Sequence, residues 1–109
     1  MDTGSIEKCV QECYACALAC DQCEAACLSE GHASEMAHCI QLDIECAEIC
    51  RLAGASMARS GDFAMRLCAL CAEVCDSCAQ ECRQHPADHC QRCADACERC
   101  AAACRQMAA

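Results

Sequence analysis

The chain has 109 residues, a formal net charge of −9 and no tryptophan, and 19 of its residues are cysteine. This length predicts a single domain spanning residues 1–109, and the acidic charge argues against binding to nucleic acid or to an anionic membrane surface, since both favour basic patches. The amino terminus, Met1 to Ser5, has neither a basic region nor an apolar run. We therefore expect no secretory signal, no membrane-spanning segment and a cytoplasmic location.

Turn-forming residues divide the chain into four predicted helices. Gly31 is typical of a helix C-terminus, Ser34 and Asp62 are typical N-caps, and Pro86 marks the last turn. Because the connections are short and no stretch alternates with a period of two, we predict an all-α fold, an antiparallel up-down-up-down four-helix bundle. The predicted helices cover about residues 5–30, 35–59, 63–84 and 87–107.

The cysteines recur mainly at intervals of three and four residues within these helices. This is the heptad rhythm that normally places leucine or isoleucine on the seam of a bundle, so the core is predicted to be lined with sulfur. In the second helix one seam position is taken by Asp43, a candidate metal ligand or acceptor of thiol protons. The predicted metal-binding cysteines are Cys9, Cys13, Cys16, Cys20, Cys23, Cys27, Cys39, Cys46, Cys50, Cys68, Cys71, Cys75, Cys78, Cys82, Cys90, Cys93, Cys97, Cys100 and Cys104.

A disulfide scaffold is the first alternative to a metal site. The odd number of cysteines and the lack of a visible export signal both argue against it. Helix positions four apart also hold their Cβ atoms ~5–6 Å from each other, whereas a disulfide needs about 3.5–4.5 Å. Bridges between helices under oxidation stay open as an alternative.

The spacing also bears on the choice of metal, because thiolates select Cu(I), Zn²⁺ and iron–sulfur clusters. The repeated unit is a C-x-x-x-C pair, and two sulfurs bound in line to one ion stand ~4.6 Å apart for bonds of ~2.3 Å, within easy reach of such a pair. Offsets of three residues link one pair to the next, which predicts a continuous column rather than separate four-sulfur cages. A Cu(I) ion that replaces one thiol proton leaves the net charge unchanged, whereas zinc on four thiolates leaves a charge of −2 to be buried.

The residues therefore favour multiple Cu(I) ions, held for storage or sequestration. Two alternatives stay open. One is a general thiolate buffer that detoxifies zinc or cadmium, and the other is an iron–sulfur electron carrier, although the ferredoxin run of cysteines is absent. We find no catalytic constellation in the sequence and expect that the protein is not an enzyme.

Antiparallel topology gives the bundle two different ends. All four histidines, His32, His38, His85 and His89, gather at one of them. His85 and His89 flank the start of the last helix beside Cys90, and we predict that they bind copper at a port into the column. The opposite end is predicted to be an apolar plug of Ile6, Ala53, Met57, Phe63, Ala64, Met65 and Met107.

With these features the chain resembles the cytosolic copper storage proteins, a family of four-helix bundles that bind Cu(I). The resemblance covers nearly the whole length and rests on the C-x-x-x-C pairs and on residues 39–46, 68–72 and 104–107. It implies a lumen that binds many Cu(I) ions through cysteine, histidines near the open end, and a homotetramer. Copper chaperones or low-molecular-weight thiols are the partners expected to exchange ions with such a store.

Overall fold

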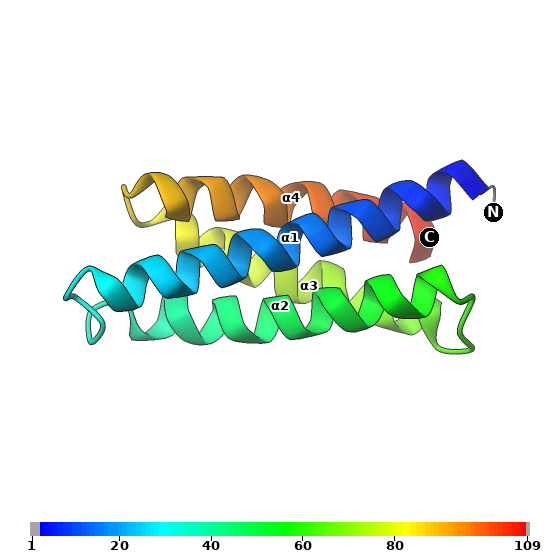
Figure 1. Ribbon diagram of the computed structural model, residues 1–109. Coiled ribbons are helices and arrows are strands. Elements are labelled where there is room, and N and C mark those ends of the chain that lie inside the picture. Colours follow the sequence, from blue (N-terminus) through cyan, green and yellow to red (C-terminus); the bar gives the residue numbers. More distant parts are fainter. Residues whose placement is uncertain (1–2, 109) are drawn as a thin grey trace.

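Four α-helices make up the computed structural model, which describes residues 3–108 (Figure 1). The residues at the two ends of the predicted domain, Met1, Asp2 and Ala109, lie outside the described residues. Met1 and Asp2 also begin the segment in which we expect no secretory signal, so the start of that segment is not described either. The helices are α1 (Thr3–Ser29), α2 (Ala37–Ala58), α3 (Ala64–Arg83) and α4 (Asp88–Ala108).

The helices form the predicted up-down-up-down bundle. Each helix packs against two neighbours, so that α1 and α3 lie on one diagonal and α2 and α4 on the other. The result is a rod of 44 × 18 × 17 Å. The α1–α2 and α3–α4 connections lie at one end of the rod, and the two chain termini and the α2–α3 connection lie at the other (Figure 1). Within residues 3–108, none of the helices is both long enough and apolar enough to cross a membrane.

The start of α2 differs from the prediction. The carbonyl of His32 accepts hydrogen bonds from the backbone N–H groups of Glu35 and Met36, both at 3.1 Å. This turn continues past Ser34, so the helix begins at Ala37. Met36 is the N-cap residue of α2, and among the described residues no side chain forms a capping hydrogen bond at this end of the helix. The prediction that Ser34 caps the helix is therefore wrong.

The start of α3 differs in a similar way. Phe63 is its N-cap, again without a side-chain hydrogen bond from the described residues, so the prediction of Asp62 is also wrong. The chain leaves α2 through Ser60, whose φ of 54° is left-handed, and the N–H of Ala64 then bonds to the carbonyl of Gly61 at 3.2 Å. Backbone hydrogen bonds thus fix this connection.

Glycine has a specific role at two positions. Gly31 follows α1 with a φ of 80°, the left-handed conformation expected of a helix C-terminus. Gly54 lies where α2 crosses α1, and a Cβ atom there would stand 2.9 Å from Cε1 of Tyr14 and 3.2 Å from Cβ of Cys13. The missing side chain therefore lets the two helices approach closely.

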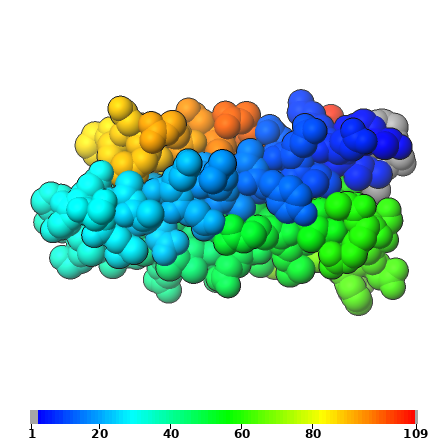
Figure 2. All heavy atoms as spheres, viewed as in Figure 1, coloured from blue at the N-terminus to red at the C-terminus, as the bar shows by residue number. Residues whose placement is uncertain are grey.

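The core consists mainly of sulfur and alanine. None of the cysteines is more than 1% exposed, and small residues such as Ala47, Ala94 and Ala101 are buried beside them. The core is narrow enough for sulfurs on diagonally opposite helices to be in contact. Cys16 Sγ lies 3.9 Å from Cys75 Sγ across the α1–α3 diagonal. In the space-filling view the side chains of α1, α2 and α4 meet in a continuous surface on one face of the rod (Figure 2).

The end that holds the termini is closed by apolar side chains, largely as predicted. Phe63 is the exception, because its side chain is 62% exposed and its ring centroid lies 6.0 Å from Cζ of Arg66. Phe63 precedes the first helical residue of α3, so the helical spacing that places seam residues in the core does not apply to its side chain. The predicted plug residues Ala53, Met57, Ala64 and Met107 are buried, and Ile6 and Met65 are partly buried.

Candidate metal site

All 19 cysteines fall within the described residues, and all are buried free thiols. They converge most closely at the middle of the bundle. Cys46 Sγ lies 3.7 Å from Cys75 Sγ, 3.8 Å from Cys50 Sγ and 3.9 Å from both Cys16 Sγ and Cys97 Sγ. These separations are well beyond the ~2.05 Å of a disulfide bond. One sulfur here therefore has sulfur neighbours on all four helices.

The sulfur contacts continue without a break toward the closed end. Cys50 Sγ lies 3.6 Å from Cys71 Sγ, and Cys71 Sγ lies 3.8 Å from Cys100 Sγ. From Cys100 the next step is 3.8 Å to Cys13, and from Cys13 it is 3.7 Å to Cys104. The predicted column is thus confirmed as a geometric feature of this half of the core.

In the other half of the core a carboxyl group joins the column. Asp43 is fully buried, and its Oδ1 accepts hydrogen bonds from the thiols of Cys78 at 3.3 Å, Cys93 at 3.4 Å and Cys82 at 3.6 Å. Burial is the main cause that raises the pKa of Asp43 to about 8, with a contribution from the nearby Cys93. At neutral pH the side chain of Asp43 is therefore mainly a neutral carboxylic acid, which can lose its proton when a cation binds nearby.

Two thiols near this end, those of Cys27 and Cys90, are also neutral. Burial raises the pKa of Cys27 to about 11 and that of Cys90 to about 12. A metal ion must displace a proton from each thiol that it binds as thiolate. Filling the column is therefore an exchange of protons for metal ions.

Groups of four thiols that could hold a metal overlap along the column. In each group the sulfurs all lie within 4.8 Å of one another, and some of the groups share members. This sharing agrees with the prediction of a column. Two groups that share Cys16 and Cys46 are Cys16, Cys46, Cys50 and Cys75, and Cys16, Cys20, Cys46 and Cys97.

His89 lies at the open end of the column, which we call the rim. Its Nδ1 lies 3.4 Å from Cys23 Sγ and 3.6 Å from Cys90 Sγ. Its Nε2 lies 2.9 Å from Oε2 of Glu30, and the side chain is only 11% exposed. With Nε2–H donated to this carboxylate, the Nδ1 lone pair points at the sulfurs, an orientation suited to binding a metal together with them.

His85, the second predicted port residue, contacts a carboxylate instead. Its Nε2 lies 2.7 Å from Oε2 of Glu81, and the other oxygen of Glu81 lies 2.9 Å from Nδ1 of His38. The structure thus separates the two histidines, and His32 is exposed in the α1–α2 connection.

The sequence analysis did not identify the two carboxylates that hold these rings. Glu81 precedes His85 by four residues on one helical face, a spacing that could have revealed the pair. Glu30 is far from His89 in sequence, and only the packing of α1 against α4 brings the two together.

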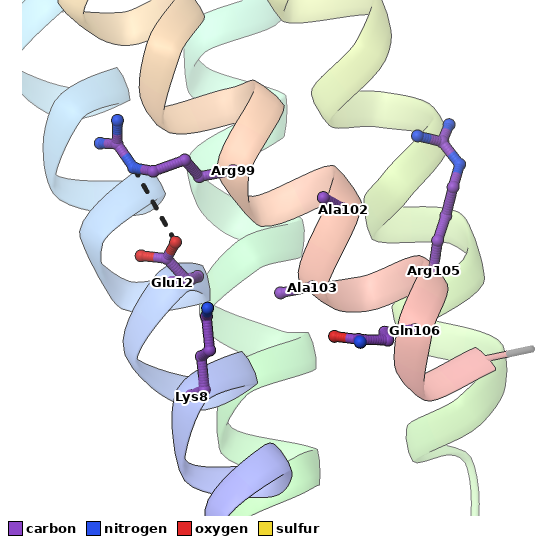
Figure 3. A pocket seen from close by; sticks show the side chains of 7 residues that line it. All are labelled: Lys8, Glu12, Arg99, Ala102, Ala103, Arg105 and Gln106. Atoms are coloured by element: carbon purple, nitrogen blue, oxygen red, sulfur yellow. Dashed lines mark ion pairs between the residues drawn. The ribbon is translucent and has the colours of Figure 1, made fainter.

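One surface hollow lies away from the sulfur column. It measures about 580 Å³ between α1 and α4. Figure 3 shows its charged and alanine side chains, with Arg99 reaching toward Glu12, and the closest atoms of that pair are 3.8 Å apart. The hollow is lined by Lys8, Glu12, Arg99, Ala102, Ala103, Arg105 and Gln106. A groove with this lining offers no soft ligands, so it has no part in the thiol site.

These features define a class of protein: a four-helix bundle whose core is a continuous column of soft ligands, with an imidazole at its open end. Comparison with known proteins gives the family. The model of the family described as copper storage protein matches residues 2–109, and the chain belongs to this family.

Two solved structures and one further relative are similar to the chain. The Cu(I)-bound copper storage protein BsCsp3 of Bacillus subtilis is 46% identical, with a TM-score of 0.92, over 96% of this chain and 99% of that one. A cytosolic copper storage protein of Streptomyces lividans, with five coppers, is 34% identical, with a TM-score of 0.92, over 96% of this chain and 92% of that one.

The relative is the cysteine-rich protein YhjQ of Bacillus subtilis (strain 168), which is described as uncharacterized. It is 47% identical over 68 residues, which are 62% of this chain and 63% of YhjQ. The match therefore spans less than two thirds of that relative.

Proposed function

We propose that this protein stores Cu(I), with many ions held by the thiols of the core. The observation that carries the proposal is the unbroken run of buried sulfurs, with neighbours 3.6–4.0 Å apart from the middle of the core toward both ends. Such separations let one thiolate bridge two Cu(I) ions, each of which needs only soft ligands in low number. Membership of the copper storage family supports the same conclusion.

Charge balance supports Cu(I) over a divalent ion. The thiols of Cys27 and Cys90 near the rim are protonated, and each Cu(I) that displaces one proton from such a thiol adds no charge to a core that excludes water. Zinc in one four-thiol group would leave two buried negative charges. Where two groups share sulfurs, as the two that contain Cys16 and Cys46 do, zinc in one group would also deprive the other of ligands.

We propose all 19 cysteines and Asp43 as the ligands of the store. The contacts of Asp43 Oδ1 with three thiols support a place for its carboxylate in a copper cluster after it loses its proton. At the rim, we propose His89 as the ligand that receives incoming ions, with Glu30 as its positioning residue. His85 stays a prediction as a port ligand.

Ions would move inward by exchange between neighbouring thiolates. In the middle of the column the next soft ligand lies within about 4 Å, as in the steps from Cys97 to Cys20 at 4.0 Å and from Cys20 to Cys93 at 3.6 Å. An ion can therefore gain a new sulfur before it releases the previous one. Copper chaperones and low-molecular-weight thiols are the proposed donors and acceptors, since both carry Cu(I) on exchangeable thiolates.

We also propose that storage takes place in the cytosol, the compartment named for the Streptomyces relative, and that the protein has no catalytic activity. Assembly as a homotetramer is supported by large apolar side chains exposed on α1 and α2. Among these, Tyr14 is 45%, Leu18 58% and Leu52 44% exposed, and a contact between copies would bury such side chains.

An anaerobic titration of the reduced protein with Cu(I), in competition with a high-affinity Cu(I) chelator, tests the proposal. We expect tight binding of ions in a number that approaches the number of thiols. Saturation after a few equivalents would contradict storage. A preference for a few zinc ions would indicate the general thiolate buffer, and a brown protein that bleaches on reduction would indicate an iron–sulfur carrier.

A further inference from the structure

The rim contains a second group of side chains of types that can bind a metal, two imidazoles and a carboxylate. Glu81 is partly buried, with 14% of its side chain exposed, and its two oxygens contact imidazoles from two different segments. Oε1 lies 2.9 Å from Nδ1 of His38 on α2, and Oε2 lies 2.7 Å from Nε2 of His85 in the α3–α4 connection. One carboxylate thus gathers two imidazoles.

These donors differ chemically from those of the column. Two imidazoles and a carboxylate are nitrogen and oxygen ligands, which suit divalent ions of intermediate softness such as Zn²⁺, whereas Cu(I) favours sulfur. Ligands on a tetrahedral zinc, each about 2.0–2.1 Å from the metal, lie about 3.3 Å from one another. The observed nitrogen–oxygen separations of 2.9 and 2.7 Å are close to this value. Small rotations of the side chains would therefore admit an ion.

The group also has space beside it. A hollow of about 300 Å³ opens next to Glu81 and His38 between α2 and α3. Its remaining walls include polar side chains that can hold a water molecule in the fourth position of a zinc site. The hollow is lined by His38, Leu42, Ser77, Gln80, Glu81 and Gln84.

We propose that His38, Glu81 and His85 form a metal site outside the thiol column, selective for a divalent ion of the Zn²⁺ type. The bound ion would link α2 to the end of α3 and to the α3–α4 connection. It would leave His89 free, because that ring bonds to Glu30 and faces Cys23 and Cys90. The rim would then present two ports with different metal preferences.

The test uses the protein with its column filled by Cu(I) under anaerobic conditions, so that thiolates are not available to the second metal. Co²⁺ is added as a spectroscopic probe and Zn²⁺ as its competitor. We expect one Co²⁺ per chain, with visible d–d bands but without thiolate-to-cobalt charge-transfer absorption, and displacement by Zn²⁺. The imidazole ¹⁵N resonances of His38 and His85 should shift with Zn²⁺, and those of His32 should not.

Two variants and one matched control locate the site. His38→Ala and Glu81→Gln should each weaken Zn²⁺ binding by at least about tenfold, the scale seen even for outer-shell changes at metal sites. The control, His32→Ala, removes an exposed histidine at the same end and should leave Zn²⁺ affinity unchanged. All three variants should keep the copper capacity of the parent.

Three results would overturn the proposal. They are the lack of stoichiometric Co²⁺ binding, charge-transfer bands that reveal sulfur ligands, and unchanged Zn²⁺ affinity in both variants. If Cu(I) does not fill the column, the storage proposal fails instead. The ¹⁵N measurement on the reduced metal-free protein then still answers whether His38 and His85 bind Zn²⁺.

Discussion

The two ends of the bundle carry side chains of opposite character on the same four helices. At the closed end Met57 and Met107 are buried and cover the last thiols with apolar side chains. At the rim, imidazoles and carboxylates bond to one another, and one imidazole reaches the thiols. The carboxyl group of Asp43 lies within the column in the rim half.

This contrast suggests that one end of the bundle stabilises the fold and that the other end exchanges metal ions with the surroundings. Apolar packing at the closed end stabilises the fold, whereas polar groups at the rim control the passage of protons and metal ions. Substitutions at the closed end should therefore change the free energy of unfolding and leave copper kinetics alone, and substitutions at the rim should do the reverse. Asp43 lies between these cases, because it is buried and also titrates.

The largest expected effect comes from Asp43→Asn in the metal-free protein. The pKa of Asp43 in the folded protein, about 8, lies above the ordinary value of 3.8, so between these values the folded state holds a proton that the unfolded chain has released. Wild-type stability should therefore fall as the pH rises through this window. Asp43→Asn should remove this loss, which amounts to as much as about 6 kcal/mol above the upper pKa, at about 1.4 kcal/mol per pKa unit.

Denaturant unfolding under reducing conditions at a series of pH values measures this difference. The stability curves of the two proteins should diverge from about pH 4 to about pH 8 and then run parallel, the window that the pKa of Asp43 sets. Curves that stay parallel throughout would show that Asp43 is ionised in the folded state.

Met57→Ala tests the closed end. The side chain is 3% exposed, and its truncation should destabilise the protein by about 2–5 kcal/mol, as for other large-to-small changes in a core. Chemical denaturation measures the loss, and stopped-flow mixing with Cu(I) should give an unchanged uptake rate. A slower uptake would mean that ions also pass through this end.

His89→Ala tests the rim. The substitution removes the ring that contacts Cys23 and Cys90, and uptake of Cu(I) should slow by more than about tenfold, while the final number of bound ions changes little. The same measurement on His85→Ala separates the two predicted port residues, since His85 bonds to Glu81 rather than to these sulfurs. Equal rates for His89→Ala and the wild type would rule out His89 as the receiving ligand.

Glu30→Gln should have the smallest effect. The carboxylate accepts the Nε2–H of His89, and an amide holds the ring less firmly, so uptake should slow by up to about tenfold. Glu24→Gln, a change of the same kind about one and a half turns earlier, within α1, provides the matched control. If Glu30→Gln took up Cu(I) as slowly as His89→Ala, Glu30 would do more than orient the ring of His89.

The sequence predicted the column well because the cysteines follow the period of the helix. The heptad spacing places every cysteine on the buried seam, and the structure confirms this for all 19. Position on the seam also explains the burial of Asp43. Because Asp43 follows the same spacing as the cysteines, its side chain points into the core, where thiols donate hydrogen bonds to its carboxyl group.

Periodicity gives less information where the helices end. Phe63 precedes α3 and points outward, and the turns before α2 and α3 form by backbone hydrogen bonds rather than through Ser34 or Asp62. The partners of the histidines depend on how two connections fold over the rim. The contacts of His38 with Glu81 and of His89 with Glu30 join segments far apart in the chain, so they leave little local signal in the sequence.

The sharing of sulfurs between groups also determines how the sequence can diverge. When a thiol belongs to several overlapping groups, as Cys16 and Cys46 do, its loss rearranges the neighbouring sites instead of deleting one of them. The loss of a single shared cysteine should then lower the capacity gradually. Position 43, where an aspartate occupies the cysteine rhythm and its carboxyl group contacts three thiols, shows that one position of the column accepts a group other than a thiol.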